Sequence, residues 1–177
     1  MSNKETIKEY DKNNNLIYRK NSNGSEFWKE FDENNNLIYS KDSDSFEVWK
    51  EYDKNNNLIY KKDSDGFEFW KEYDEKNNLI YYKSSSGYEY WNKYDKNNNL
   101  IHYKDSDGFE FWQEFDKNNN LIHFKDSDGI ECWYKYDENN EQIKITQQEF
   151  KQIERRKEKR ELYLNIKKSN RFEIMDI

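Results

Sequence analysis

The sequence predicts an all-β repeat array: an antiparallel β-hairpin meander, drawn out as an elongated twisted strip or coil, with a short C-terminal tail of helical or mixed structure. Two periodicities lead to this prediction, because Trp and the Asp of a Tyr-Asp or Phe-Asp pair both recur every 21 residues. Composition agrees, since 33% hydrophobic residues are too few for a conventional core, whereas 18% aromatic residues are too many for a disordered chain. The Trp residues are Trp28, Trp49, Trp70, Trp91, Trp112 and Trp133.

Each 21-residue unit is expected to be one β-hairpin. In one unit, residues 67–73 and 79–83 are strand-length runs rich in aromatic and other β-favouring residues. Between the runs, residues 63–66 are Asp-Ser-Asp-Gly and residues 74–78 are Asp-Glu-Lys-Asn-Asn, and the Asp, Ser, Asn and Gly in them favour turns. Two strands and two turns fill the unit and leave no room for a crossover. We therefore expect about thirteen strands, each antiparallel to its neighbours.

Composition divides the chain into two parts. Residues 1–144 form the repeat array, a degraded first half-unit followed by six units, with a formal charge of −10. Residues 145–177 hold nine basic and six acidic residues, a net charge of +3, and form a basic C-terminal helix with possible short strands. Worn terminal units are typical of the caps of repeat arrays.

The odd period constrains the strand register. Side chains alternate between faces, so two turns of like parity would move Trp to the opposite face in each successive unit. Either the two turns differ in parity or a β-bulge intervenes.

Two registers satisfy this constraint. In the first, Asn77 is left-handed, and Trp70 shares a face with Ile80 and Tyr82. The other face then holds Phe67, Phe69, Tyr73, Leu79 and Tyr81. In the second, Gly66 is left-handed, Lys62 faces Glu68, and Trp70 joins Leu79 and Tyr81. We favour the first register.

The run Tyr52-Asp53-Lys54-Asn55-Asn56-Asn57-Leu58, followed by Gly66, resembles the YD repeat of the bacterial RHS family, and the likeness extends over residues 5 to about 144. Asn56 and its equivalents stand where the family has Gly, and Asn is the next-best residue for a left-handed turn. The resemblance implies a β-strip. RHS proteins build long strips that form shells around toxins, but six units are too few to enclose a cargo and the self-cleaving core has no counterpart here.

The C-terminal tail begins with a capping box, in which Thr146 is the N-cap and Glu149 the N3 residue. It predicts a helix from about 147 to 160 or beyond, carrying Phe150. Residues 162–166 alternate as a strand would and could pair with 172–174, and continuation of the helix is the competing interpretation. We expect the part of this helix near Phe150 to dock on one face of the sheet, in its more aromatic C-terminal half. That half is marked by Tyr82, Tyr103 and Phe124.

Candidate chemical groups mostly fit structural roles. The single Cys132 and the two His residues, His102 and His123, occupy positions that are usually aromatic in other units, which indicates packing. The Asp-Ser-Asp-Gly turns supply fewer oxygens than a Ca²⁺ loop requires, and a row of equivalent Glu residues offers no unique acid–base couple. The Asn triplets could form an amide ladder. We expect no enzyme activity, no catalytic residue, no metal site and no cofactor.

The aromatic ladder is the feature that predicts function, because Trp and Tyr rimmed by charge are typical of interaction hot spots. The expected partner-binding residues are the six Trp residues together with Tyr82, Tyr103, Phe124, Glu68, Glu89 and Glu110. The tail adds Arg155, Arg156, Lys157, Lys159 and Arg160.

The predicted function is a non-enzymatic protein–protein interaction module. We expect an inhibitor or sequestering protein that acts on a protein or ribonucleoprotein, as anti-defence (anti-CRISPR-type) or toxin-immunity proteins do. A carbohydrate- or cell-wall-binding array and nucleic-acid binding through the basic tail are alternatives. The net charge of −7 disfavours direct nucleic-acid binding. Because the N-terminus carries no signal-peptide pattern and no apolar run could span a bilayer, we expect a cytoplasmic protein without a membrane partner.

Overall fold

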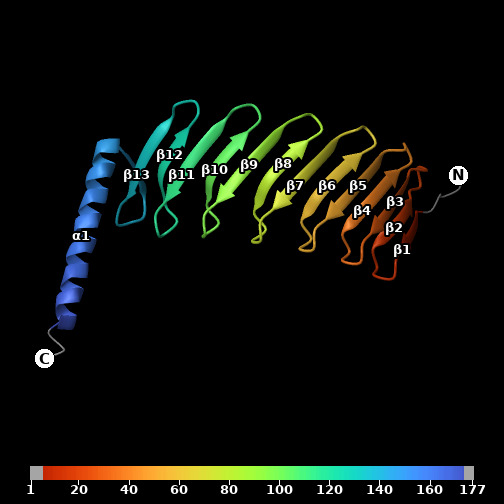
Figure 1. Ribbon diagram of the computed structural model, residues 1–177. Coiled ribbons are helices and arrows are strands. Elements are labelled where there is room, and N and C mark those ends of the chain that lie inside the picture. The colour runs from red at the N-terminus through yellow and green to blue at the C-terminus, as the bar shows by residue number, and fades with distance from the viewer. Residues whose placement is uncertain (1–5, 174–177) are drawn as a thin grey trace. The chain divides into compact units, whose positions relative to one another are not determined.

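The computed structural model describes residues 6–173, with side chains through residue 165. Fourteen strands follow one another in a single antiparallel meander, and one helix, α1 (Gln147–Glu173), comes after them (Figure 1). This confirms the predicted all-β repeat array with a helical tail. The strands are β1 (Ile7–Tyr10), β2 (Leu16–Lys20), β3 (Glu26–Phe31), β4 (Leu37–Asp42), β5 (Glu47–Tyr52), β6 (Leu58–Asp63), β7 (Glu68–Tyr73), β8 (Leu79–Ser84), β9 (Glu89–Tyr94), β10 (Leu100–Asp105), β11 (Glu110–Phe115), β12 (Leu121–Asp126), β13 (Glu131–Tyr136) and β14 (Gln142–Ile145).

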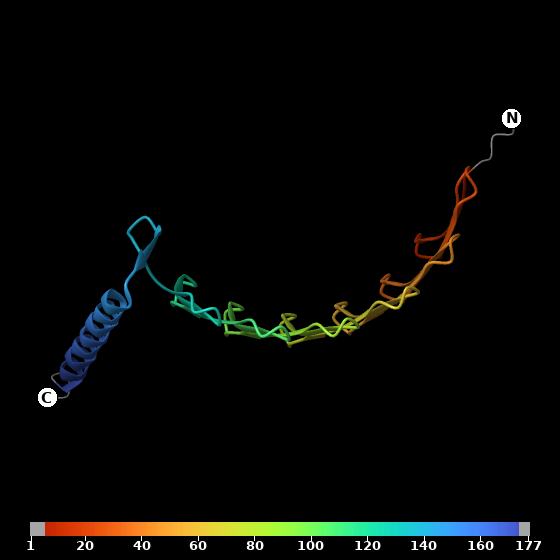
Figure 2. The ribbon, with the colours of Figure 1, turned by 90° about the horizontal axis from the view of Figure 1, so that it is seen from above.

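The chain divides into two compact units, one ending at Phe109 and one beginning at Glu110. The first unit holds β1–β10, and Figure 2 shows these strands as a single layer. The second unit holds β11–β14 and α1. Among the described side chains, only Cys132 and Ile145 are buried hydrophobic residues. Strand pairing and contacts between side chains on neighbouring strands therefore stabilise the sheet in place of a core.

Both turns of each repeat have a left-handed residue at the same position of the turn, three residues after the first turn residue. Asn77 has a φ of 64° and Gly66 a φ of 89°. In the Asn turn, the backbone N–H of Asn77 donates to the carbonyl of Asp74 at 3.0 Å. In the Gly turn, the N–H of Gly66 donates to the carbonyl of Asp63 at 3.1 Å. These are three-residue hairpin loops of like parity.

A β-bulge compensates for the like parity of the turns. Glu72 pairs with Tyr81, but Tyr73 pairs with Leu79, so Ile80 is an extra residue. The same shift occurs in the equivalent hairpins from β1–β2 to β11–β12. The bulge shifts the strand register by one residue in each 21-residue unit and so keeps the Trp residues of a compact unit on one face.

The first of the two predicted registers is therefore wrong. Tyr82 lies opposite Lys71, on the face away from Trp70, because the bulge lies between Tyr82 and the turn. The second register correctly places Lys62 opposite Glu68 and puts Trp70 on the face of Tyr81. Its prediction for Leu79 is wrong, since that residue pairs with Tyr73.

The sheet of the first unit thus has two distinct faces. We call one the Trp face, which carries Trp28, Trp49, Trp70 and Trp91. We call the other the Phe/Tyr face, which carries Phe27, Val48, Phe69 and Tyr90. The bulge and the two turns determine which side chains reach each face.

The Tyr-Asp motif organises one edge of the sheet. The Asp74 carboxylate accepts hydrogen bonds from the backbone N–H groups of Lys76 and Asn78, both at 2.9 Å, and from the Asn78 side chain at 3.0 Å. The Asn78 side-chain bond is the main cause that lowers the pKa of Asp74. Asn78 then donates to Asn98 of the next turn at 3.1 Å, and Asn57 donates to Asn77 at 2.9 Å. These bonds confirm the amide ladder in the first unit.

Serine residues join the repeats at the opposite edge. The backbone N–H of Ser85 donates to the Glu68 carbonyl at 2.8 Å, and the Ser85 hydroxyl accepts the Glu68 N–H at 2.9 Å. The preceding Ser64 makes the same pair of bonds with Glu47. The Asp63 carboxylate accepts the backbone N–H of Phe67 at 3.0 Å, which is the structural role expected for the Asp-Ser-Asp-Gly turns.

The Tyr of the Tyr-Asp pair stabilises the bulge. The Tyr94 hydroxyl donates to the carbonyl of Leu79, at the start of the bulged strand, at 3.2 Å, and Tyr52 donates to Leu37 at the same distance. Burial raises the pKa of the Tyr94 hydroxyl, which therefore stays a donor.

The second unit ends differently. In the β13–β14 hairpin the register has no shift, so Ile145 lies opposite Trp133. The capping box is confirmed, because the backbone N–H of Thr146 donates to Glu149 at 2.8 Å and the Glu149 N–H donates to the Thr146 hydroxyl at 3.2 Å. Phe150 then packs on Trp133, with 4.7 Å between the ring centroids.

Two expectations for the tail are wrong. Residues 162–166 and Phe172 belong to α1 and form no strand, because the helix continues to Glu173; Ile174 lies outside the described residues. The helix also docks on the other face, since Phe124 pairs with Cys132, on the side of β13 away from Trp133. No helix in the described part of the chain is long and apolar enough to cross a membrane.

Candidate functional site

The Trp face of the first unit presents a row of solvent-exposed indoles. Its four Trp side chains are between 37% and 42% exposed, although each also packs on a Tyr. In the second unit Trp112 is 40% exposed, whereas Trp133 is half-buried under Phe150. Exposed indoles in a regular row are unusual for a protein surface without a binding role.

Each indole is oriented by a fixed set of neighbours. The Trp91 ring packs on Tyr81 of the preceding strand with 5.5 Å between centroids, and three other Tyr–Trp pairs repeat this contact at 5.5–5.7 Å. The Tyr81 hydroxyl donates to Glu89 at 2.9 Å, and Lys83 pairs with the same carboxylate at 2.7 Å. The indoles are therefore held in place by contacts within the sheet.

The electrostatics of this cluster follow from the shared carboxylate. The hydrogen bond from Lys83 lowers the pKa of Glu89 and in turn raises the pKa of Lys83. Burial, followed by the bond to Glu89, raises the pKa of the Tyr81 hydroxyl. At neutral pH the cluster is an ion pair capped by a neutral phenol.

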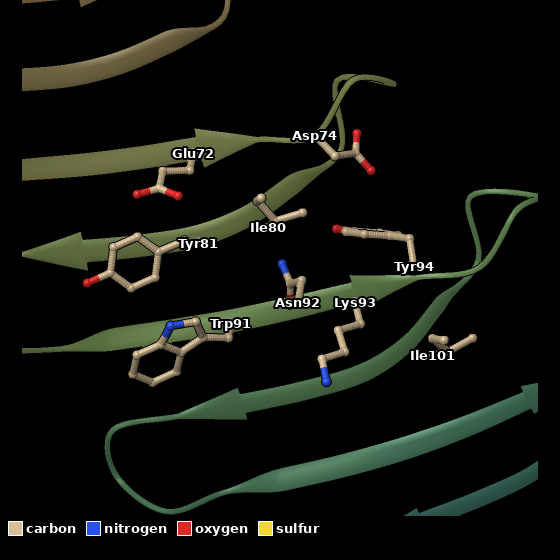
Figure 3. A pocket seen from close by; sticks show the side chains of 9 residues that line it. All are labelled: Glu72, Asp74, Ile80, Tyr81, Trp91, Asn92, Lys93, Tyr94 and Ile101. Atoms are coloured by element: carbon tan, nitrogen blue, oxygen red, sulfur yellow. The ribbon is translucent and has the colours of Figure 1, made fainter.

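A groove of about 660 Å³ runs beside Trp91 (Figure 3). Figure 3 shows the Tyr81 and Trp91 rings side by side on neighbouring strands, with Glu72 beyond Tyr81 and Lys93 farther along β9. The lining residues are Glu72, Asp74, Ile80, Tyr81, Trp91, Asn92, Lys93, Tyr94 and Ile101. Aromatic walls with an acid and a base at the rim suit a partner's side chain or chain segment.

The sequence did not single out Lys93. Its equivalents in earlier repeats of the first unit include Glu30, Glu51 and Glu72, so the charge at this one position of the Trp face is reversed in the repeat that holds Lys93. A comparison of this one position across the repeats would have identified it.

The structure distributes the predicted partner-binding residues over both faces. Glu68 and Glu89 lie on the Trp face, where Lys62 and Lys83 pair with them. Tyr82 and Tyr103 lie on the Phe/Tyr face, so they do not join the Trp row.

In the second unit, the predicted residues are also divided. Phe124 lies opposite Cys132, on the side of β13 away from Trp133. Glu110 begins β11, where its backbone N–H donates to the Ser127 hydroxyl at 3.1 Å. The five basic tail residues are exposed on α1, and one of them, Lys157, pairs with Glu154 at 2.7 Å.

His123 packs as the repeat pattern predicts. Its ring stacks on Trp133 with 3.7 Å between centroids, in the position that Tyr holds elsewhere. The two ring nitrogens lie 3.1 Å from Glu114 and from Glu131. Cys132 is buried, and hydrogen bonds with Lys144 and Tyr134 lower the pKa of its thiol. Within the described residues, no group of three or more His, Cys, Asp or Glu side chains is placed to hold a metal ion.

Comparison with known proteins supports the fold. The sequence matches no family model and no curated protein. The crystal structure of TcdB2-TccC3 is similar at a TM-score of 0.59 and 14% identity over 76% of this chain. The Photorhabdus luminescens Tc holotoxin pore carrying TccC3-D651A is similar at a TM-score of 0.51 and 12% identity over 78% of this chain. This chain spans only 9% and 10% of those chains, and the likeness shows a shared β-hairpin meander.

Proposed function

We propose that this chain is a non-enzymatic protein-binding module and that the Trp face is its contact surface. The observation that carries the proposal is the row of indoles, each 37–42% exposed and each packed on a Tyr, with a Lys–Glu pair on the same face of every repeat. Trp and Tyr bury large areas on binding and have few rotatable bonds to immobilise, which is why they dominate interaction hot spots. Such a module acts by covering its partner's surface, as an inhibitor or sequestering protein does.

The fold supports the same kind of role. The structures with a similar meander, TcdB2-TccC3 and a Tc holotoxin pore, are multi-protein assemblies. The Tyr-Asp turns, with Asn in the left-handed position, support a relationship to the YD repeats of RHS proteins. A repeat array offers an extended surface for such contacts.

The test is capture of a partner from the native host with the full chain as bait. A variant with Trp70→Ala and Trp91→Ala should lose the protein that the wild type retains. A matched variant with Tyr82→Ala and Tyr90→Ala, which removes two rings from the other face, should keep it. Circular dichroism confirms that both variants fold.

Retention of the partner by the Trp variant would refute the proposal. So would a wild-type chain that binds polysaccharide in affinity electrophoresis and captures no protein.

A further inference from the structure

The two faces of the first unit differ in charge as well as in their rings. On β2–β8 every strand Glu lies on the Trp face, whereas the Phe/Tyr face carries five cations and no Glu. These cations are Arg19, Lys29, Lys50, Lys61 and Lys71. The Phe/Tyr face also holds Asp42 and Asp63, but both lie at the turns and accept backbone N–H groups there. The formal charge of −7 for the whole chain conceals this basic surface.

The cations on the two faces have different partners. On the Trp face, Lys20, Lys41, Lys62 and Lys83 each pair with a Glu at 2.5–3.1 Å. Among the side chains described through residue 165, none of the five cations on the Phe/Tyr face forms an ion pair. All five are half-buried along the sheet surface. Their charge is therefore available to an anionic ligand.

Aromatic rings lie directly beside these cations. The Lys71 ammonium is 4.8 Å from the Phe69 ring centroid, Lys61 is 5.9 Å from Phe67, and the Arg19 guanidinium is 5.8 Å from another Phe ring. Phe67 is 40% exposed. A ligand on this face therefore meets a positive charge and a flat ring together in several repeats.

The rings continue as a platform across the last strands of the unit. Phe69 lies 5.9 Å from Tyr82, Tyr82 stacks on Tyr90 at 5.0 Å and 16°, and Tyr90 stacks on Tyr103 at 5.7 Å. The Tyr103 hydroxyl bonds to Tyr88 at 2.7 Å, which fixes the end of the row. This row of rings on β7–β10 begins beside Lys71 and continues from the cations on β2–β7.

We propose that the Phe/Tyr face of the first unit binds single-stranded nucleic acid. Each nucleotide supplies one phosphate and one flat base, the same two groups that the repeats are built to receive. An acidic peptide supplies charge without regularly spaced rings. A duplex hides its bases, so it meets only the cations. This site is distinct from the Trp face of the proposed function. It is also distinct from the basic C-terminal tail, for which nucleic-acid binding was an alternative prediction.

The test is fluorescence anisotropy of a labelled 20-nucleotide oligo-dT with the full chain at 50 mM salt. The basic-face variant is Lys29→Gln, Lys50→Gln and Lys71→Gln. The matched control is Lys41→Gln, Lys62→Gln and Lys83→Gln, which removes an equal number of positive charges from the Trp face. The basic-face variant should bind about tenfold more weakly, and the slope of log affinity against log salt should fall by about 2. The control should change affinity less than threefold.

Two further variants test whether the rings contribute to binding and which face of the sheet binds. Replacing Tyr82 and Tyr90 by Leu should weaken binding with an unchanged salt slope, whereas the Trp70→Ala, Trp91→Ala variant should bind as the wild type does. That variant separates this site from the protein-binding surface, because each proposal can fail while the other stands.

Three results would overturn the inference: no anisotropy change at 50 mM salt, equal losses in the two Lys variants, or displacement by polyglutamate or duplex DNA as effective as displacement by unlabelled oligo-dT.

Discussion

Replacing Asn77 tests whether the left-handed turn or the amide ladder makes the larger contribution to stability. Asn77 has a φ of 64°, and its side-chain oxygen accepts bonds from Asn57 at 2.9 Å and from Asn55 at 3.0 Å. Asn77→Gly removes the two exposed ladder bonds but leaves the backbone unstrained, at a cost of about 1 kcal/mol. Asn77→Ala removes the same bonds and adds about 1–2 kcal/mol for the left-handed conformation.

The two variants should therefore differ by about 1–2 kcal/mol. With a urea m-value of about 2 kcal/mol/M, their unfolding midpoints should lie about 0.5–1 M apart, with Ala the lower. Urea titration followed by Trp fluorescence measures this difference. Coincident midpoints would show that residue 77 needs no left-handed tolerance, and the account of the turn parity would then fail.

Three further outcomes are expected. Tyr52→Phe should lower the free energy of unfolding by about 1 kcal/mol because it deletes the hydroxyl bond to a strand carbonyl, while Phe31→Tyr should add the equivalent bond and raise it by a similar amount; equal urea midpoints for both variants and the wild type would contradict this. The pKa of Asp74 is lowered in the folded state, so its contribution is present above the ordinary value of 3.8 and is lost as pH falls through the folded pKa. Urea midpoints should accordingly drop below about pH 4, and Asp74→Asn should lessen the drop; a pH-independent midpoint would refute the turn electrostatics. Phe150→Ala should cost the second unit about 2 kcal/mol, with loss of helical circular dichroism, whereas Leu162→Ala, at an exposed position on the same helix, should do neither.

Local patterns in the sequence were enough to predict several elements. The 21-residue spacing of Trp and of the Tyr-Asp pair placed the hairpins, because turn residues and strand-length aromatic runs act over a few residues. The Thr146 and Glu149 capping box placed the start of α1 for the same reason. The amide ladder also followed, since equivalent turns of a meander lie beside one another.

The register could not be derived in this way. A bulge at Ile80 moves every later side chain of the strand to the other face, yet Leu and Ile at this position look like ordinary strand residues. The position of the bulge depends on hydrogen bonding between strands, and this pairing cannot be inferred from the residues of a single strand. The favoured register therefore had Tyr82 on the wrong side of the sheet, and the separation of charge between the faces could not be predicted from it.

The end of the array differs for a related reason. The β13–β14 hairpin has no bulge, so Ile145 comes to lie opposite Trp133 and α1 starts on the Trp133 side of β13. Periodic sequence alone specifies which residues form strands and turns, since those choices are local. Pairing between strands decides which rings and charges share a face, because a shift of one residue exchanges the two faces of a single-layer sheet.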